Sequence, residues 1–168
     1  TPGIGTPHHL TMELFKQTAG LDMVHVPYRG GAPMTQDLLA GQVPIMFGSY
    51  VIAGPHLKTG KMKAIASSSS RRTPQTPEIP SVAEQGYPGF HVESWFGLVT
   101  PTATPPSAIA RMSKEVHAVL EAADFKQRLL QIGFEPPPVM TVKEFGELLA
   151  ADVAKWSKVV KDVGIKPE

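Results

Sequence analysis

Residues 1–31, TPGIGTPHHLTMELFKQTAGLDMVHVPYRGG, decide the fold. Thr6 suits a helix N-cap, Pro7 suits the first helical position and Gly20 suits the residue after a helix, so the stretch predicts a helix over 7–19. The apolar run 23–26 predicts a short buried strand, and the turn 27–31 leads to a second helix over 32–40. A strand, a glycine-rich turn and a helix in succession are typical of a parallel sheet.

The alternation of strands and helices continues to about residue 99. The segments 43–47 and 62–66 predict two further strands, and the imperfect alternation of apolar and polar residues over 90–99 predicts a third. The helix expected over 51–59 should be interrupted at Pro55. Ser81 and Glu84 have the spacing of a capping box and predict one helical turn that Gly86 ends. This order of elements indicates the α/β class with a mostly parallel sheet.

The chain becomes mainly helical after residue 101. One helix should follow Pro106, a second should start at Asp124 and stop at Gly133, and a capping box of Thr141 and Glu144 should open the last. Apolar side chains form one stripe along that last helix, at Val142, Phe145, Leu149, Val153, Trp156, Val160 and Val163. Their burial is worth on the order of 10–20 kcal/mol, so we expect another copy, a separate chain or a non-native packing against residues 1–99 to cover the stripe.

Composition excludes several function classes. The chain has 168 residues, 16 Lys and Arg against 15 Asp and Glu, and a net charge of +1, which argues against a nucleic-acid partner. It has no Cys, hence no disulfide scaffold, thiolate zinc site or Cys nucleophile. The six His show no H-x-x-x-H pair, and the chain contains no G-x-S-x-G motif. We therefore predict no metal, no cofactor and no catalytic residues.

Glycine-rich loops are the candidate binding elements. Loop 1–6 opens a helix, and helix N-termini attract anions through their unpaired N–H groups. Two further loops of small residues, one with Gly30 and Gly31 and one with Gly48 and Ser49, follow predicted strands. Ligands of open α/β sheets bind at the carboxyl ends of the strands. An ordinary turn is the alternative for the first loop alone, whereas the three together predict a convergent anion site. Its residues would be Thr1, Gly3, Gly5, Thr6, Tyr28, Gly30, Gly31, Gly48 and Ser49.

The same loops resemble segments of a known family. The matching stretches are TPGIGT at 1–6, VPYRGG at 26–31, LLAGQV at 38–43, IPSVAEQG at 79–86 and WFGL at 95–98. As a set they resemble the Bug, or TctC-like, extracytoplasmic solute receptors of tripartite tricarboxylate transporters. The resemblance implies a periplasmic-binding-protein-like (type II) architecture of two α/β lobes that close on a small organic carboxylate. It also implies a periplasmic location, membrane transporter subunits as partners and no catalysis.

The resemblance further implies a division of the chain. Residues 1–92 would form the second ligand-binding lobe without its first strand or strands, 93–101 the crossover between lobes, and 102–168 a helical segment that completes the first lobe. Members are longer at the N-terminus, so we expect the signal peptide and the first lobe's sheet to be missing here. Gly48 stands where many members carry Asp, which speaks against ligands with an ammonium group.

Two other functions stay open at this point. A ligand-sensing domain of a regulator has the same two-lobe architecture, although this sequence shows no helix-turn-helix. A phosphate-binding enzyme would use the first loop, although no base, nucleophile or metal set accompanies it. Because the last helix carries so much apolar surface, we also expect the chain to self-associate through it.

Overall fold

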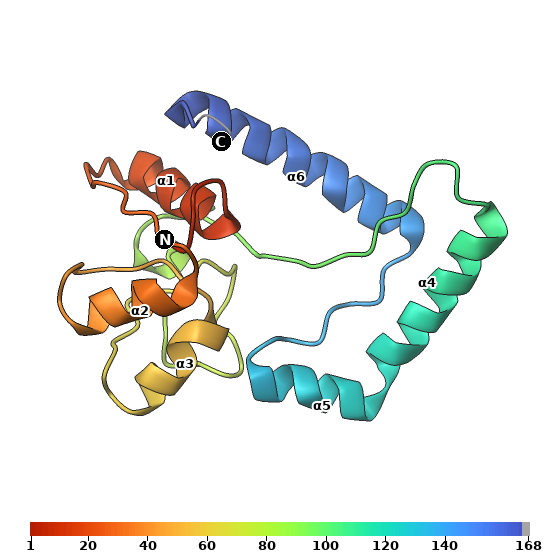
Figure 1. Cartoon of the computed structure of the whole chain (residues 1–168), viewed down its shortest axis with the longest axis horizontal. Helices are drawn as coiled ribbons and strands as arrows, with labels where there is room; N and C mark the ends of the chain where they lie inside the picture. Colours follow the sequence, from red (N-terminus) through yellow and green to blue (C-terminus); the bar gives the residue numbers. More distant parts are fainter. Residues whose placement is uncertain (166–168) are drawn as a thin grey trace. The chain divides into compact units, whose positions relative to one another are not determined.

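The computed structural model describes residues 1–165, and the chain divides into two compact units (Figure 1). The first unit comprises Thr1–Ser94 and the C-terminal segment from Trp156 onward, and the second comprises Trp95–Lys155. The elements of the described residues are α1 (Pro7–Ala19), α2 (Gly31–Leu39), α3 (Tyr50–Lys58), the 3-10 turn η1 (Ala83–Gln85), α4 (Pro106–Glu121), α5 (Ala123–Ile132) and α6 (Val142–Val163). The division into lobes that the sequence suggested stays a prediction.

The predicted bounds of α1 are confirmed by its caps. The hydroxyl of Thr6 accepts a hydrogen bond from the His9 N–H at 3.3 Å, and Pro7 occupies the first turn. Gly20 ends the helix with a φ of 63°, a left-handed conformation that glycine adopts without steric cost. Helix α1 therefore begins and ends where its local sequence dictates.

Both predicted capping boxes are present. The carboxylate of Glu84 accepts from the Ser81 N–H at 2.7 Å, and the Ser81 hydroxyl accepts from the Glu84 N–H at 3.2 Å. The Thr141 and Glu144 pair repeats the arrangement at the start of α6. In each box the backbone N–H holds the pKa of the glutamate below its usual value, because it stabilises the ionised carboxylate.

Two helices differ from expectation in detail. Helix α2 begins at Gly31, one residue earlier than predicted. Helix α3 runs from Tyr50 to Lys58 straight through Pro55, so the predicted interruption is wrong. Pro55 removes one backbone hydrogen bond, to the carbonyl of Val51, and Val51 lies in the exposed first turn, where water can replace that bond.

The predicted strands are absent from the described residues, which contain a single isolated parallel bridge between Ser67 and Ser81. A strand needs a neighbour that pairs with it at every second residue. Here the segments exchange isolated bonds, such as the Val82 N–H with the Ser67 carbonyl at 2.9 Å and the Val92 N–H with the Ser68 carbonyl at 2.8 Å. The segments 23–26, 43–47, 62–66 and 90–99 therefore form no strand in the described chain.

The segment 23–26 is also not buried as predicted. Val24 is 90% exposed and Val26 42%, and Ile65 in the segment 62–66 is 63% exposed. Apolar side chains of a strand are buried on both faces only where other elements cover both faces of its sheet, and the described residues form no such sheet.

The core of the first unit lies between α1, the loops around 82–92 and the end of α6. Val82, Phe90 and Val92 are buried, and Phe15 and Trp156 pack against them. The Phe15 ring meets the rings of Tyr87 and Phe90 edge-on, with centroids 5.7 and 5.8 Å apart. This core fixes α1 and therefore the glycine-rich loop that precedes it.

Helix α6 buries only part of its apolar stripe. Trp156 contacts the core of the first unit, and Val159, which lies outside the predicted stripe, is 6% exposed. The C-terminal part of the stripe thus packs against residues 1–99, and the expectation that this packing is non-native stays a prediction. Val142 at 58% and Val153 at 57% remain exposed in the described chain, so cover of this part by another copy or a separate chain stays a prediction. None of the helices in residues 1–165 is long and apolar enough to cross a membrane.

Candidate functional site

Loop 1–6 is tied to the second glycine-rich loop by backbone hydrogen bonds. The amino group of Thr1 donates to the Val26 carbonyl at 3.1 Å, and the Tyr28 N–H donates to the Thr1 carbonyl at 3.0 Å. The Gly30 N–H donates to the Pro2 carbonyl at 2.9 Å. Two of the predicted loops therefore form one continuous surface.

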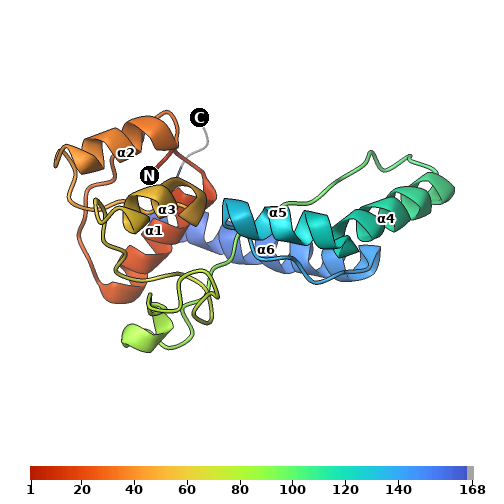
Figure 2. The ribbon, with the colours of Figure 1, turned by 90° about the horizontal axis from the view of Figure 1, so that it is seen from below.

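The third loop is brought close to the other two by tight packing. A Cβ on Gly31 would lie 2.5 Å from the Ile52 side chain of α3, so glycine at this position lets α2 and α3 approach (Figure 2). Gly48 lies against the Met34 side chain of α2, where a Cβ would be 3.3 Å from its terminal methyl. The ring of Phe47 lies 6.4 Å from that of His8 at the start of α1. All the predicted site residues thus gather in the first unit.

Helices α2 and α3 both begin without a side-chain cap. Gly30 precedes α2 with a φ of 108°, and Ser49 precedes α3, but its hydroxyl makes no capping hydrogen bond. N–H groups of an uncapped first turn lack intrahelical partners and carry partial positive charge. The hydroxyl of Tyr28 is turned to the Asp37 carboxylate of α2, at 2.9 Å. The starts of these helices therefore offer backbone donors to a ligand, whereas the Tyr28 hydroxyl is engaged by Asp37.

Thr6 and Gly5 shape the first loop from within. The Thr6 hydroxyl donates to the Gly3 carbonyl at 2.8 Å in addition to capping α1. Gly5 has a φ of 70°, and its N–H donates to Nδ1 of His9 at 3.0 Å. The Gly5 N–H, which the sequence suggested as a donor to a ligand, is engaged inside the protein in this structure.

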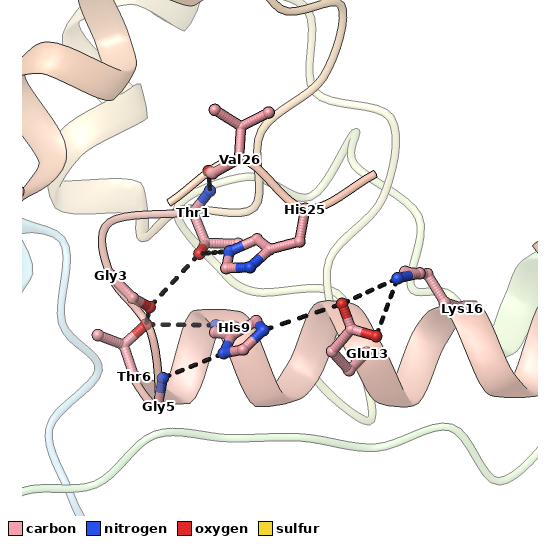
Figure 3. A network of polar contacts seen from close by, with 9 residues as sticks. All are labelled: Thr1, Gly3, Gly5, Thr6, His9, Glu13, Lys16, His25 and Val26. Carbon is pink, nitrogen blue, oxygen red and sulfur yellow. Dashed lines mark hydrogen bonds and ion pairs between the residues drawn. The ribbon is translucent and has the colours of Figure 1, made fainter. Parts of the chain in front are cut away.

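A stacked pair of histidines, of which His9 is buried and His25 half-buried, lies next to the loop (Figure 3). His9 is 5% exposed, and its ring stacks on that of His25 with centroids 3.9 Å apart. Nε2 of His25 lies 2.6 Å from the Thr1 hydroxyl, and Nε2 of His9 lies 3.9 Å from the Glu13 carboxylate, which Lys16 binds at 2.9 Å. Burial lowers the pKa of His9 below its usual value and that of His25 to about 4.

Sequence reasoning missed this pair. His9 occupies the third helical position after the Thr6 cap, from which a side chain can reach back to an N–H before the helix, as the glutamate of a capping box does. That spacing was a local signal for His9. His25 lies 16 positions further along, and its stacking on His9 depends on the tertiary structure. No group of three or more His, Cys, Asp or Glu suited to a metal forms within residues 1–165.

Comparison with solved structures identifies the architecture. The chain superimposes on Rpa4515 from R. palustris, solved with adipate, with a TM-score of 0.84 and 33% identity over 98% of this chain and 55% of that one. It superimposes on the periplasmic binding protein BugD with a TM-score of 0.81 and 30% identity, over 99% and 56% of the two chains. For MatC from Rhodopseudomonas palustris, with bound malate, the values are 0.79 and 32%, over 91% and 53%. The predicted periplasmic-binding-protein-like fold is thus confirmed, and the chain covers about half of it.

Comparison with protein sequences identifies the family. A UPF0065 protein encoded between tcbD and tcbE in Pseudomonas sp. strain P51 is 33% identical over 94% of this chain and 47% of its own length. A second UPF0065 protein, from the clcB–clcD region of Pseudomonas knackmussii, is 30% identical over 94% of both chains. The chain therefore spans about half the length of the first relative and nearly all of the second. Residues 1–165 match the family described as "Tripartite tricarboxylate transporter family receptor", so the chain belongs to this TctC family.

Proposed function

We propose that this chain forms part of an extracytoplasmic receptor that captures a small organic carboxylate for a tripartite tricarboxylate-type transporter. The observation that carries the proposal is the family match over residues 1–165, together with structural neighbours solved with adipate and with malate. The receptor would work in the periplasm, deliver its ligand to membrane transporter subunits and catalyse no reaction.

The chemistry of the loops supports a carboxylate ligand. The predicted site residues carry no charged side chain, and the uncapped starts of α2 and α3 add N–H donors with partial positive charge. Such donors bind an anion without the desolvation cost of burying a lysine or arginine. Thr1, Gly3, Gly5, Thr6, Tyr28, Gly30, Gly31, Gly48 and Ser49 are the proposed binding residues.

Gly48 supports a ligand without an ammonium group. An acidic side chain at this position could pair with a ligand ammonium, whereas glycine offers it no partner. A buried ammonium without a partner is costly. We therefore propose a mono- or dicarboxylate rather than an amino acid.

Calorimetry with matched ligands tests this proposal. Succinate and aspartate, and likewise glutarate and glutamate, differ by one ammonium group; adipate and malate complete the panel. We expect saturable binding of at least one organic acid and none of its amino-acid counterpart. Binding of aspartate or glutamate with no binding of any organic acid would refute the ligand class.

A substitution at the same position sharpens the test. Gly48→Asp places a carboxylate next to the proposed ligand and needs only a small shift of the flexible Met34 methyl. Because like charges repel, the Kd for the organic acid should rise tenfold or more. This estimate is for one pair of like charges at a partly buried position. The isosteric Gly48→Asn separates this charge effect from the change in size.

A further inference from the structure

We infer that His9, held as the neutral imidazole, is the positioning residue of the glycine-rich loop 1–6, because its Nδ1 atom accepts the Gly5 N–H and thereby fixes the loop in its binding conformation. The inference deepens the proposed function and rests on it for the role of the loop. His9 would contact no ligand and would act through Gly5.

The geometry around His9 leaves little freedom to the ring. His9 is 5% exposed, its own N–H donates to the Thr6 hydroxyl, and its ring lies parallel to His25 within 13°. The backbone of His9 thus joins the helix cap, and its side chain links the segment 23–26 to the loop. Gly5 has a left-handed φ of 70°, and its N–H is held by the Nδ1 atom of His9 at 3.0 Å.

The hydrogen-bond donors define the protonation state. Since Nδ1 accepts from Gly5 at 3.0 Å, the neutral ring carries its proton on Nε2, which faces the Glu13 carboxylate at 3.9 Å. A second proton would sit on Nδ1 and point at the Gly5 N–H, so two donors would face each other. Protonation of His9 therefore breaks the contact that sets the loop.

Several titratable groups surround the His9 ring. Glu13 and Lys16 face it from α1, His25 from the segment 23–26 and the Thr1 amino group from the loop. Glu13 favours the protonated ring, while the Lys16 and Thr1 charges disfavour it together with burial. Burial is the largest of these effects, so the ring stays neutral at pH 7.

Two conservative substitutions separate the positioning role from simple packing. In His9→Asn the amide oxygen stands near the place of Nδ1, accepts from Gly5 and does not titrate. In His9→Gln the amide group reaches the place of Nε2 and leaves Gly5 without an acceptor. His91→Gln, a half-exposed histidine paired with Glu93, is the matched control.

The first readout is the Gly5 amide resonance between pH 4 and 8, which needs no ligand. We expect the resonance to shift as the pH falls below 6.5 in the wild-type chain, and to shift much less in His9→Asn, where only the neighbouring His25 still titrates. A wild-type Gly5 amide that does not respond to pH in this range, or one that responds equally in His9→Asn, would overturn the inference.

The second readout is affinity at pH 7, with adipate and malate as probes. Losing one hydrogen bond that fixes the loop should raise Kd about two- to tenfold in His9→Gln, while His9→Asn and His91→Gln stay near wild type. Equal affinities of His9→Gln and wild type would contradict the positioning role. If neither probe nor any other carboxylate binds the wild type, the proposed function fails, and the Gly5 resonance still decides the inference.

Discussion

Removing the Thr6 hydroxyl should both destabilise the first unit and loosen the loop 1–6. The hydroxyl makes two hydrogen bonds, accepting from the His9 N–H at 3.3 Å and donating to the Gly3 carbonyl at 2.8 Å. Loss of an N-cap costs about 0.5–2 kcal/mol, and water can reach the half-buried Gly3 carbonyl. We expect Thr6→Ala to lower the free energy of unfolding by about 1.5 kcal/mol.

Urea unfolding followed by Trp156 fluorescence measures this loss. Trp156 packs against the core of the first unit, and a Trp95→Phe background removes the tryptophan of the second unit. With a slope of about 1–3 kcal/mol per M, the midpoint should fall by about 0.5–1.5 M. Thr6→Ser keeps the hydroxyl and should restore most of the loss.

Thr18→Ala is the matched control on the same helix. The Thr18 hydroxyl only donates back to the Leu14 carbonyl on an exposed face, so its removal should change stability by less than about 0.5 kcal/mol. If Thr6→Ala costs no more than Thr18→Ala, Thr6 does not cap α1 in solution and our account of the loop is wrong.

Three further predictions concern other parts of the chain. Gly5→Val should weaken carboxylate binding without unfolding the protein, because valine does not tolerate a φ of 70°; calorimetry and circular dichroism check both halves of this statement. The free energy of unfolding should fall as the pH drops from 6.5 towards 4, because His25 binds a proton in the unfolded chain but stays neutral in the folded one. Urea midpoints measured at pH 7 and 4.5 should therefore differ less in His25→Gln than in the wild type. The chain should self-associate through the exposed part of α6, and sedimentation should find Val153→Lys shifted to monomer; a wild-type chain that is monomeric at all concentrations would contradict this.

Helix ends were predictable because their determinants are local. Thr6, Gly20 and the two capping boxes act within four residues of the backbone groups that they satisfy, and each appears where the sequence placed it. The prediction at Pro55 was wrong because the local sequence shows that Pro55 removes a hydrogen bond, but not that the freed carbonyl lies at an exposed turn where water can bind it.

Strands and the histidine pair depend on partners far away in the sequence. The run 23–26 has the composition of a strand, but composition does not supply the neighbour that would pair with it. The stacking of His9 on His25 likewise arises only when α1 folds back along the segment 23–26. For α6, the residue spacing defined the apolar face but not which residues pack against it. In the structure, only the C-terminal part of this face packs against the core around Phe90.

The most direct test of the central claim is an amide NMR titration of the full-length receptor with adipate and malate up to millimolar concentrations. If backbone N–H groups of the glycine-rich loops hold the carboxylate, saturable shifts should concentrate on Gly3, Thr6, Gly30, Gly31 and Ser49. Aspartate at the same concentrations should leave them in place. Absence of saturable shifts in these loops for every carboxylate, or shifts confined to the second unit, would contradict the account.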